Sequence, residues 1–321
     1  MKIVVLDGHT IVQDDLNWDG LKKFGQITVY DQTPYEEDVT VERIGDADVV
    51  MVSKVPMTAS VMDRCPNLRY IGVTATGYNI VDVNAAKARN IIVTNVPGYG
   101  TDAVAEFVFA LLLHLTRQIG VCNESVKKGD WISCKDFCYL PCNQMSLNGK
   151  YMGIIGFGQI GRRTAQLAEA FGMKLLVYTR HPKKEEESEN LTFVTLEELY
   201  QKADVISLHC PLTEENYHMI DKNALERMKK TAFLINTSRG PLIDEQALAE
   251  ALLKGSIQAA ALDVVEQEPM SPECPLKEID NCIITPHIAW ASNECRELLI
   301  ESIIKNLEAF LNGAPVHVVS K

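Results

Sequence analysis

Short runs of Val, Ile and Leu alternate with amphipathic stretches along most of the chain. In the first hundred residues, helical patterns such as residues 82–89 separate the apolar runs. Strands that alternate with helices form a parallel sheet with helices on both of its faces. The apolar runs predict five strands, at residues 1–6, 27–30, 47–53, 69–74 and 91–94.

A second series of the same kind begins near residue 151. The last helix of the chain, about residues 292–311, is long enough to pack back on the first series. Two such series predict an α/β protein with two doubly wound parallel-sheet domains. The strands of the second series are predicted at residues 151–155, 174–178, 205–209, 232–236, 259–262 and 282–285.

Between the two series, residues 102–118 carry apolar side chains at helical spacing. Asp102 is expected to cap this helix at its start. The helix is apolar nearly all round, so we expect it to be buried between domains or subunits. For His114, which lies in this run, we expect a buried histidine with satisfied hydrogen bonds and no catalytic role.

Residues 123–148 are polar and irregular in pattern, and we interpret them as a connecting arm. The pattern leaves three aromatic side chains exposed on this arm, those of Trp131, Phe137 and Tyr139.

Length and composition place the chain among globular proteins of two domains. It has 321 residues, of which 46% are hydrophobic and 23% charged. It contains no apolar run of 18 or more residues, and its first residues lack the features of a signal peptide, so we expect a cytoplasmic protein with no membrane partner. A net charge of −12 disfavours nucleic acid as a partner, because it repels phosphate.

The nine cysteines are an odd and scattered set. Cys134, Cys138 and Cys142 are spaced by four residues, which raises the question of a metal site. Zinc sites usually have closely paired cysteines with a second pair or histidines nearby, and neither follows here. We therefore expect reduced thiols and no metal.

A glycine-rich segment follows the predicted strand at 151–155 and opens a helix that extends to Phe171. A strand, glycine loop and helix in this order are typical of dinucleotide binding. The glycines allow a tight turn, a close approach of backbone to the pyrophosphate, and close packing of helix on strand. The helix N-terminus offers N–H groups to the phosphates. The segment reads Gly156, Phe157, Gly158, Gln159, Ile160 and Gly161.

The residues after the next strand bear on the choice of cofactor. NAD enzymes usually place an acidic residue there, about 20 residues beyond the loop, to bind the ribose hydroxyls. Here Thr179 stands in that place and Arg180 follows it. A missing carboxylate removes repulsion of a 2′-phosphate, and an arginine can pair with one. These residues favour NADP(H), with a solvated basic turn on an NAD(H) enzyme as the alternative.

Three side chains capable of acid–base and carboxylate chemistry lie near the ends of predicted strands. Arg239 offers a planar fork that matches a carboxylate. His287 can give and take a proton near neutral pH, and Glu268 could hold its imidazole and favour the protonated form. Ligands of open α/β sheets bind at this edge, so the three are candidate catalytic residues.

These segments resemble the D-isomer-specific 2-hydroxyacid dehydrogenase family over essentially the full length of the chain. Within that family the chain most resembles the glycerate dehydrogenases, or hydroxypyruvate reductases. The motifs that carry the closer resemblance are Thr74-Ala75-Thr76-Gly77-Tyr78-Asn79, Asn95-Val96-Pro97-Gly98-Tyr99, Asp136-Phe137-Cys138 and His287-Ile288-Ala289-Trp290.

The resemblance implies a flavodoxin-like substrate domain from both chain ends, at 1–101 and 290–321, and an inserted Rossmann cofactor domain at 102–289. It also implies a homodimer through the cofactor domain. For the site it implies catalytic roles for Arg239, Glu268 and His287. Further implied contacts are Asp263 with the nicotinamide carboxamide, Cys210, Pro211 and Thr237 along the adenosine and ribose path, and the backbone of Ala75, Thr76 and Gly77 with the substrate carboxylate.

The sequence therefore predicts an enzyme that moves a hydride between NAD(P)H and a small 2-keto or 2-hydroxy acid. Hydroxypyruvate with D-glycerate, or glyoxylate with glycolate, is the expected substrate pair. One alternative is another enzyme of the fold, such as a D-lactate dehydrogenase. A formate dehydrogenase is disfavoured by Glu268, where such enzymes carry Gln. The other alternative is a nucleotide-sensing, corepressor-like binding protein, against which the complete set of catalytic residues argues.

Overall fold

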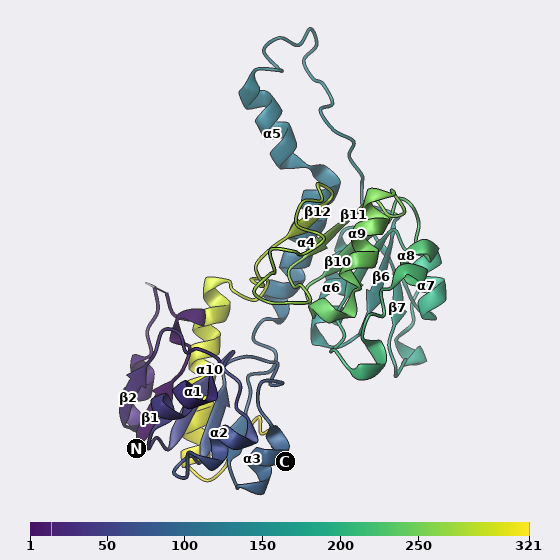
Figure 1. Ribbon diagram of the computed structural model, residues 1–321. Helices are drawn as coiled ribbons and strands as arrows, with labels where there is room; N and C mark the ends of the chain where they lie inside the picture. The colour runs from purple at the N-terminus through teal and green to yellow at the C-terminus, as the bar shows by residue number, and fades with distance from the viewer. Residues whose placement is uncertain (14, 321) are drawn as a thin grey trace. The chain divides into compact units, whose positions relative to one another are not determined.

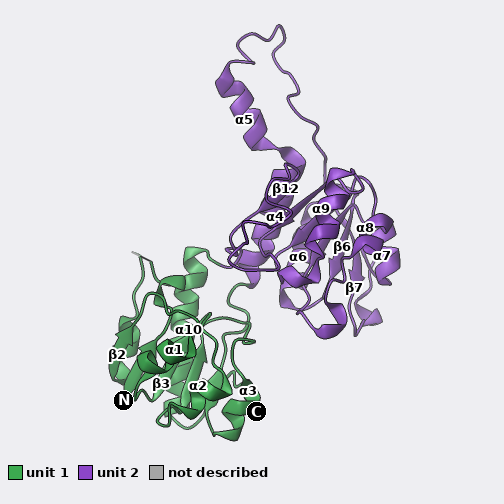
Figure 2. Ribbon diagram, in the orientation of Figure 1, with its two compact units in different colours: residues 1–100, 291–321 green, residues 101–290 purple. Residues whose placement is uncertain are grey.

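The computed structural model describes residues 1–13 and 15–320, and it divides into two compact units (Figures 1 and 2). Unit 1 comprises Met1–Gly100 and Ala291–Lys321, and unit 2 comprises Thr101–Trp290. Each unit has its own parallel sheet. Two parallel-sheet α/β domains were expected from the alternating pattern, and the fold class is confirmed.

Unit 1 is built on a five-stranded parallel sheet of order β2-β1-β3-β4-β5, the flavodoxin-like order. Alternate strand residues face opposite sides of the sheet, so helices cover both faces. The C-terminal helix α10 packs against β4, and the ring centroids of Phe310 and Tyr70 lie 4.8 Å apart there. The elements are β1 (Lys2–Val5), β2 (Gln26–Val29), α1 (Glu37–Ile44), β3 (Val49–Val52), α2 (Ala59–Asp63), β4 (Tyr70–Val73), α3 (Val83–Ala88), β5 (Ile92–Thr94) and α10 (Asn293–Leu311).

Unit 2 is built on a seven-stranded parallel sheet of order β12-β11-β10-β9-β6-β7-β8. The order reverses between β6 and β9, and in open sheets the crevice at the carboxyl ends of such strands binds ligands. The strands are β6 (Tyr151–Ile155), β7 (Lys174–Tyr178), β8 (Leu191–Phe193), β9 (Val205–Leu208), β10 (Phe233–Asn236), β11 (Ala259–Leu262) and β12 (Cys282–Ile284), and the helices are α4 (Thr101–Arg117), α5 (Ile119–Lys128), α6 (Gln159–Ala170), α7 (Leu196–Lys202), α8 (Lys222–Arg227) and α9 (Glu245–Leu253).

Two separate cores fill the faces of the unit 2 sheet. On one face α4 and α6 pack on the strands, and on the other α7, α8 and α9 do so. The strands between them are buried on both faces, which explains why three of the four residues of β9 and of β10, and all four of β11, are apolar. β8 was not predicted, because Leu-Thr-Phe at a sheet edge is too short to give a pattern.

The expectations for α4 are wrong in two respects. The helix begins at Thr101, so Asp102 lies in its first turn instead of capping it, and its carboxylate pairs with Arg163 at 2.6 Å. His114 is exposed, not buried. It continues a stripe of exposed positions with Glu106 and Ala110, spaced by four residues along one side of a helix that is otherwise buried. The helix is therefore one-sided despite its apolar composition.

The arm predicted at 123–148 is partly helical, contrary to expectation. α5 continues from α4 after a bend of 49°, with Gln118 at a left-handed φ of 46° between the two. α5 and the segment that returns to β6 extend away from the sheet of unit 2 (Figure 1). Across the described chain no single helix is long and apolar enough to cross a membrane; only the bent pair α4 and α5 passes on length and composition.

Candidate active site

The turn after β6 packs directly on the loop after β9. Gly156 has a φ of +97°, a left-handed conformation that glycine adopts without strain. A Cβ on Gly156 would lie 2.6 Å from the backbone N of Cys210 and from the carbonyl of His209. The turn therefore requires glycine, both for its conformation and for this close approach.

The next residues expose a helix N-terminus at the same edge. Gly158 is the N-cap of α6, and no side chain caps the helix there. The first N–H groups of α6, at Gln159, Ile160 and Gly161, have no intrahelical partner by the geometry of any α-helix. Unpaired N–H groups at a helix start bind anions, and a pyrophosphate is such an anion.

Two buried polar atoms at this edge suit a bound dinucleotide. Within the described chain, His209 Nδ1 and Thr237 Oγ1 are buried and have no hydrogen-bond partner. Burial lowers the pKa of His209 to about 4, so its ring is neutral, and Nε2 lies 2.9 Å from Ser207 Oγ. A Cβ on Gly158 would meet no atom within 4 Å, so space is open beside the turn. Orphaned polar atoms, free helix amides and open space together fit a dinucleotide.

The loop that carries Cys210 and Pro211 is shaped by a side-chain amide. Asn216 Nδ2 donates to the carbonyl of Pro211 at 2.8 Å, and Asn216 Oδ1 accepts from the N–H of Thr213 at 2.7 Å. These bonds hold the loop after β9 at the carboxyl edge of the sheet, in the place where the sequence puts the ribose path.

The corner beyond β7 is exposed and rich in ion pairs. Arg180 is 62% exposed, and its Nη1 lies 3.9 Å from Glu215 Oε2. Nearby, Glu186 accepts two hydrogen bonds from Arg162, at 2.6 and 3.2 Å, and lies 3.7 Å from Lys183 Nζ. Arg162 and its neighbours hold the pKa of Glu186 below its usual range. Arg162, Arg180 and Lys183 are thus already paired with carboxylates.

His287 and Glu268 form a hydrogen-bonded pair at the ends of β12 and β11. Nδ1 of His287 lies 2.8 Å from Glu268 Oε2, and the other carboxylate oxygen accepts the N–H of Val265 at 3.2 Å. Burial raises the pKa of Glu268, but the hydrogen bond and charge of His287, with the charge of Arg239, leave it below its usual value. An ionised Glu268 stabilises the protonated imidazolium.

Arg239 extends from a loop fixed by a buried amide. Asn236, fully buried at the end of β10, donates from Nδ2 to the carbonyl of Arg239 at 2.8 Å and accepts the N–H of Ser238 at 2.9 Å. Arg239 Nη1 donates to the carbonyl of Ser238 at 2.6 Å. Gly240 then lets the loop touch the next one, because a Cβ there would lie 1.9 Å from the carbonyl oxygen of Val265.

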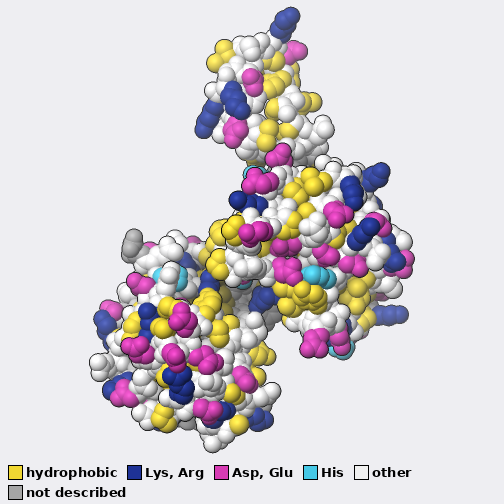
Figure 3. Space-filling model, in the orientation of Figure 1, with side chains coloured by type: hydrophobic (Ala, Val, Ile, Leu, Met, Phe, Trp, Pro, Cys, Tyr) yellow, Lys and Arg dark blue, Asp and Glu magenta, His cyan; other side chains and the backbone are white. Residues whose placement is uncertain are grey.

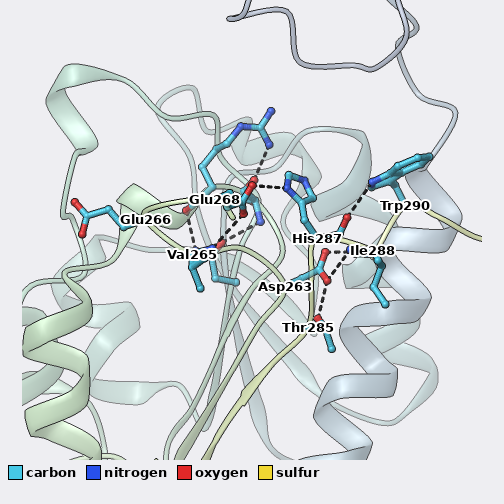
Figure 4. A network of polar contacts seen from close by, with 12 residues as sticks. Asp263, Val265, Glu266, Glu268, Thr285, His287, Ile288 and Trp290 are labelled. Atoms are coloured by element: carbon cyan, nitrogen blue, oxygen red, sulfur yellow. Dashed lines mark hydrogen bonds and ion pairs between the residues drawn. The ribbon is translucent and has the colours of Figure 1, made fainter. Parts of the chain in front are cut away.

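Asp263 holds the turn that carries His287 (Figure 4). Its carboxylate is 1% exposed and accepts from Thr285 Oγ1 at 2.6 Å and from the N–H groups of Ile288 and Ala289 at 2.9 and 2.8 Å. The N–H of His287 donates to the carbonyl of Asp263 at 2.8 Å, which helps to fix a left-handed φ of 56° at His287. Burial raises the pKa of Asp263 despite these donors. Asp263 therefore positions His287.

Several residues of this network were not found from the sequence. Asn236, Ser238 and Thr285 have no chemistry of their own that would single them out, and His209 was included only as the last residue of a predicted strand. One signal was available: each of the four lies at or just beyond the carboxyl end of a predicted strand, where ligand sites form.

The residues expected to bind the substrate carboxylate lie in unit 1. The loop after β4 is held by residues that follow β5: Thr76 Oγ1 donates to the carbonyl of Val96 at 2.9 Å, and Asn95 Nδ2 donates to the carbonyl of Thr76 at 2.7 Å. The N–H of Val96 donates to the carbonyl of Ala75 at 3.0 Å. The role of Ala75, Thr76 and Gly77 toward substrate stays a prediction.

Known proteins similar to this chain include a family and several of its named members. Residues 109–289 match the family described as D-isomer specific 2-hydroxyacid dehydrogenase, NAD binding domain. The chain is 47% identical to a hydroxypyruvate reductase of Blautia hydrogenotrophica over 100% of both chains, and 42% identical to a glycerate dehydrogenase of Methylorubrum extorquens over 90% of both.

Solved structures are similar over the whole chain. An acyclic imino acid reductase (Bsp5) in complex with NADPH and D-Arg has a TM-score of 0.85 and 33% identity, over 99% of this chain and 100% of that one. A D-lactate dehydrogenase from Aquifex aeolicus, complexed with NAD and lactic acid, has a TM-score of 0.86 and 29% identity, over 100% and 99%.

Proposed function

The chain belongs to the D-isomer specific 2-hydroxyacid dehydrogenases, and we propose that it reduces hydroxypyruvate to D-glycerate, or glyoxylate to glycolate. The observation that carries the proposal is the 2.8 Å hydrogen bond between His287 and Glu268 at the same sheet edge as Arg239 and the glycine-rich turn. The named activities of similar proteins support the choice of substrate: a hydroxypyruvate reductase and a glycerate dehydrogenase.

The chemistry divides among three side chains. Arg239 binds the carboxylate of the keto acid through its planar fork and polarises the C2 carbonyl. The nicotinamide, when bound, supplies the hydride to C2. His287 donates its proton from Nε2 to the carbonyl oxygen as negative charge develops there, while Glu268 at Nδ1 stabilises the imidazolium before the transfer. Asp263 keeps the imidazole in place through the turn at 285–289.

The residues that would hold the dinucleotide lie along the same edge. The N–H groups of Gln159, Ile160 and Gly161 would bind the pyrophosphate, and Thr237 Oγ1 and the loop of Cys210 and Pro211 would lie along the ribose path. Asp263 has a second proposed role, a contact with the carboxamide. Unit 1 would supply the carboxylate-binding backbone of Ala75, Thr76 and Gly77, which makes it the substrate domain and unit 2 the cofactor domain.

For the cofactor we favour NADP(H) over NAD(H). Thr179 carries no charge that would repel a 2′-phosphate, and Arg180 can pair with one. The 3.9 Å contact of Arg180 with Glu215 is long and exposed, so a phosphate dianion can displace it at little cost. Among similar proteins both cofactors occur in complexes, NADPH in one and NAD in the other.

We propose that the arm of unit 2 forms the interface of a homodimer. The surface of the arm shows apolar side chains (Figure 3). Large apolar side chains left in water favour association, and a second copy offers the same surface by symmetry. We further place the protein in the cytoplasm, without nucleic acid or membrane as partners. The exposed large apolar side chains of α5 and of the segment that returns to β6 are those of Ile119, Val121, Val126, Trp131, Ile132, Phe137 and Leu140.

The experiment that tests the proposal measures kcat/KM for a panel of 2-keto acids with NADPH and with NADH. Hydroxypyruvate or glyoxylate should give the highest value, with pyruvate lower. A best value with pyruvate would favour the D-lactate type. Binding of NADPH without turnover of any keto acid would favour a nucleotide-sensing protein and overturn the proposal.

The dimer has its own test in sedimentation velocity. Ile132 and Leu140 are 91% and 88% exposed, so changing both to Asp removes apolar contacts without disturbing the fold of the isolated chain. The wild type should sediment as a dimer and the double variant as a monomer. A wild-type monomer, or a double variant that stays dimeric, would contradict the assignment.

A further inference from the structure

The two legs of the arm are joined by a ladder of contacts. One leg is the end of α4 with α5, and the other is the segment 137–145 that returns toward β6. The two legs run antiparallel, so the residue numbers of the paired positions rise along one leg and fall along the other. They are Thr116 with Met145 at 3.0 Å, Arg117 with Gln144 at 3.0 Å, Gln118 with Asn143 at 3.1 Å and Ser125 with Tyr139 at 2.9 Å.

A pair of cysteines occupies the middle of this ladder. Cys122 Sγ on α5 lies 3.6 Å from Cys142 Sγ on the returning leg, and both residues are partly buried. A disulfide needs the sulfurs at about 2.05 Å, so the two sulfurs must approach each other further for a bond to form. The contacts on either side of the pair hold the legs together while the bond forms.

We propose that Cys122 and Cys142 are a site of reversible thiol oxidation, at which a low-molecular-weight disulfide closes the base of the arm. One thiolate of the pair attacks one sulfur of the oxidant RSSR, forming a protein–S–SR mixed disulfide and releasing RS⁻. The other thiolate then attacks the protein sulfur of that mixed disulfide, forming the Cys122–Cys142 bond and releasing the second RS⁻. The two protein thiols lose two electrons and two protons, and the oxidant becomes two RSH.

The surroundings of the pair affect the rate of exchange. Desolvation, together with the neighbouring Cys122 thiol, raises the pKa of the Cys142 thiol. The exchange should be faster at pH 8.5 than at pH 7, because thiolates are the reacting species.

The nearest competing thiols are less suitably placed. Cys138 is exposed, so it can take up a mixed disulfide, and Cys134 Sγ lies 3.8 Å from the carbonyl oxygen of Cys138. Cys134 and Cys138 lie in the part of the arm beyond the Cys122–Cys142 pair, so they serve as matched controls in the same segment.

The bond would join residues 122–142 into one covalent ring. That ring carries the three most exposed large apolar side chains of the arm, those of Ile132, Phe137 and Leu140, together with that of Trp131. Oxidation would thus fix the base of the surface that we assign to a second copy, while the chemistry of the thiols does not depend on that assignment or on the dehydrogenase activity.

The test oxidises the full chain with glutathione disulfide, blocks free thiols with iodoacetamide and maps non-reduced tryptic peptides by mass spectrometry. Trypsin separates Cys122, on the peptide ending at Lys127, from Cys142, on the peptide ending at Lys150. The wild type and Cys138→Ser should give these two peptides linked, in a product that dithiothreitol reverses. Cys122→Ser and Cys142→Ser should not give it, and Cys134→Ser should.

Three results would overturn the proposal. One is a wild-type chain that carries only glutathione adducts, and another is a link that survives in Cys142→Ser but is lost in Cys138→Ser. The third is a covalent dimer on non-reducing gels in place of the intramolecular link. Timed alkylation of the wild type needs no variant: protection of Cys122 and Cys142 should rise together as oxidation proceeds, and protection of one alone would contradict the pairing.

Discussion

The two ends of the carboxyl edge of the unit 2 sheet are held in different ways. At the end of β10, β11 and β12, buried side chains fix every loop: Asn236 beneath Arg239, and Asp263 beneath His287. At the end of β7, the side chain of Arg180 makes an exposed ion pair with Glu215, which solvent screens. The loops of the proposed catalytic residues Arg239 and His287 are thus held by buried side chains. The side chain of Arg180, which is expected to select the cofactor, is not held in this way.

The largest expected effect comes from His287→Ala. Without the imidazole no side chain at the end of β12 can donate the proton, so kcat should fall about a hundredfold or more. Steady-state kinetics measure the loss, and fluorescence titration should show unchanged cofactor affinity. His114→Ala, on the exposed side of α4, is the control. A His287 variant that retains a tenth of wild-type turnover would remove that residue from the role.

A smaller loss is expected from Asp263→Asn. The amide would turn an N–H toward one of the three donors that the carboxylate now accepts, and a buried donor left unpaired costs about 1–3 kcal/mol. Both the unfolding temperature and kcat should fall, because the turn that carries His287 loses its anchor. In Asp244→Asn, which only caps α9, kcat should be unchanged. Equal kcat losses in both variants would refute a positioning role for Asp263.

Glu268→Gln should move the pH profile of reduction instead of abolishing activity. A neutral amide cannot stabilise the imidazolium, so the pH at which activity falls on the alkaline side should shift downward. The pKa of Glu268 lies below its usual range, so its carboxylate should stay ionised as the pH falls through the usual range for glutamate. The ion pair with His287 should be lost only at the lower pH at which Glu268 takes up a proton. The matched control is Glu266→Gln, on the same loop, where Glu266 faces His218 at 3.1 Å. An unmoved profile in Glu268→Gln would show that the pair does not couple.

The smallest effect is expected at the exposed corner. NADPH should give a higher kcat/KM than NADH, and Thr179→Asp should reverse the order by repelling the 2′-phosphate. The change should appear in KM, because the 2′-phosphate lies far from the hydride and contributes uniform binding. Lys184→Gln, a nearby exposed charge, should reduce NADPH binding only slightly. A wild-type preference for NADH at matched ionic strength would refute the interpretation of Thr179 and Arg180 and leave the family unchanged.

The same contrast explains what the sequence could and could not predict. Apolar runs that are buried on both faces predicted the strands β6, β7 and β11 with their observed bounds. The arm was misread because α5 has no buried residue, and a helix without a buried face leaves no apolar stripe in the sequence.

Side-chain networks were harder to predict than elements. The contact of Glu268 with His287 followed from chemistry, since a carboxylate and an imidazole at neighbouring strand ends pair readily. The hydrogen bonds of Asp263 to the turn at 285–289 could not be predicted from chemistry alone. They depend on which backbone N–H groups face the carboxylate after the chain has folded. A sequence shows which side chains lie at the carboxyl edge of a sheet, but not which of them already form hydrogen bonds within the protein.

The central claim is that the chain moves a hydride to C2 of a small 2-keto acid. The most direct measurement incubates hydroxypyruvate with NADPH deuterated at C4, using each of the two C4 stereoisomers in turn, and analyses the product by NMR and chiral chromatography. The account predicts D-glycerate with deuterium at C2 from one of the two isomers. Glycerate without deuterium at C2 from either isomer, or L-glycerate as the product, would contradict it.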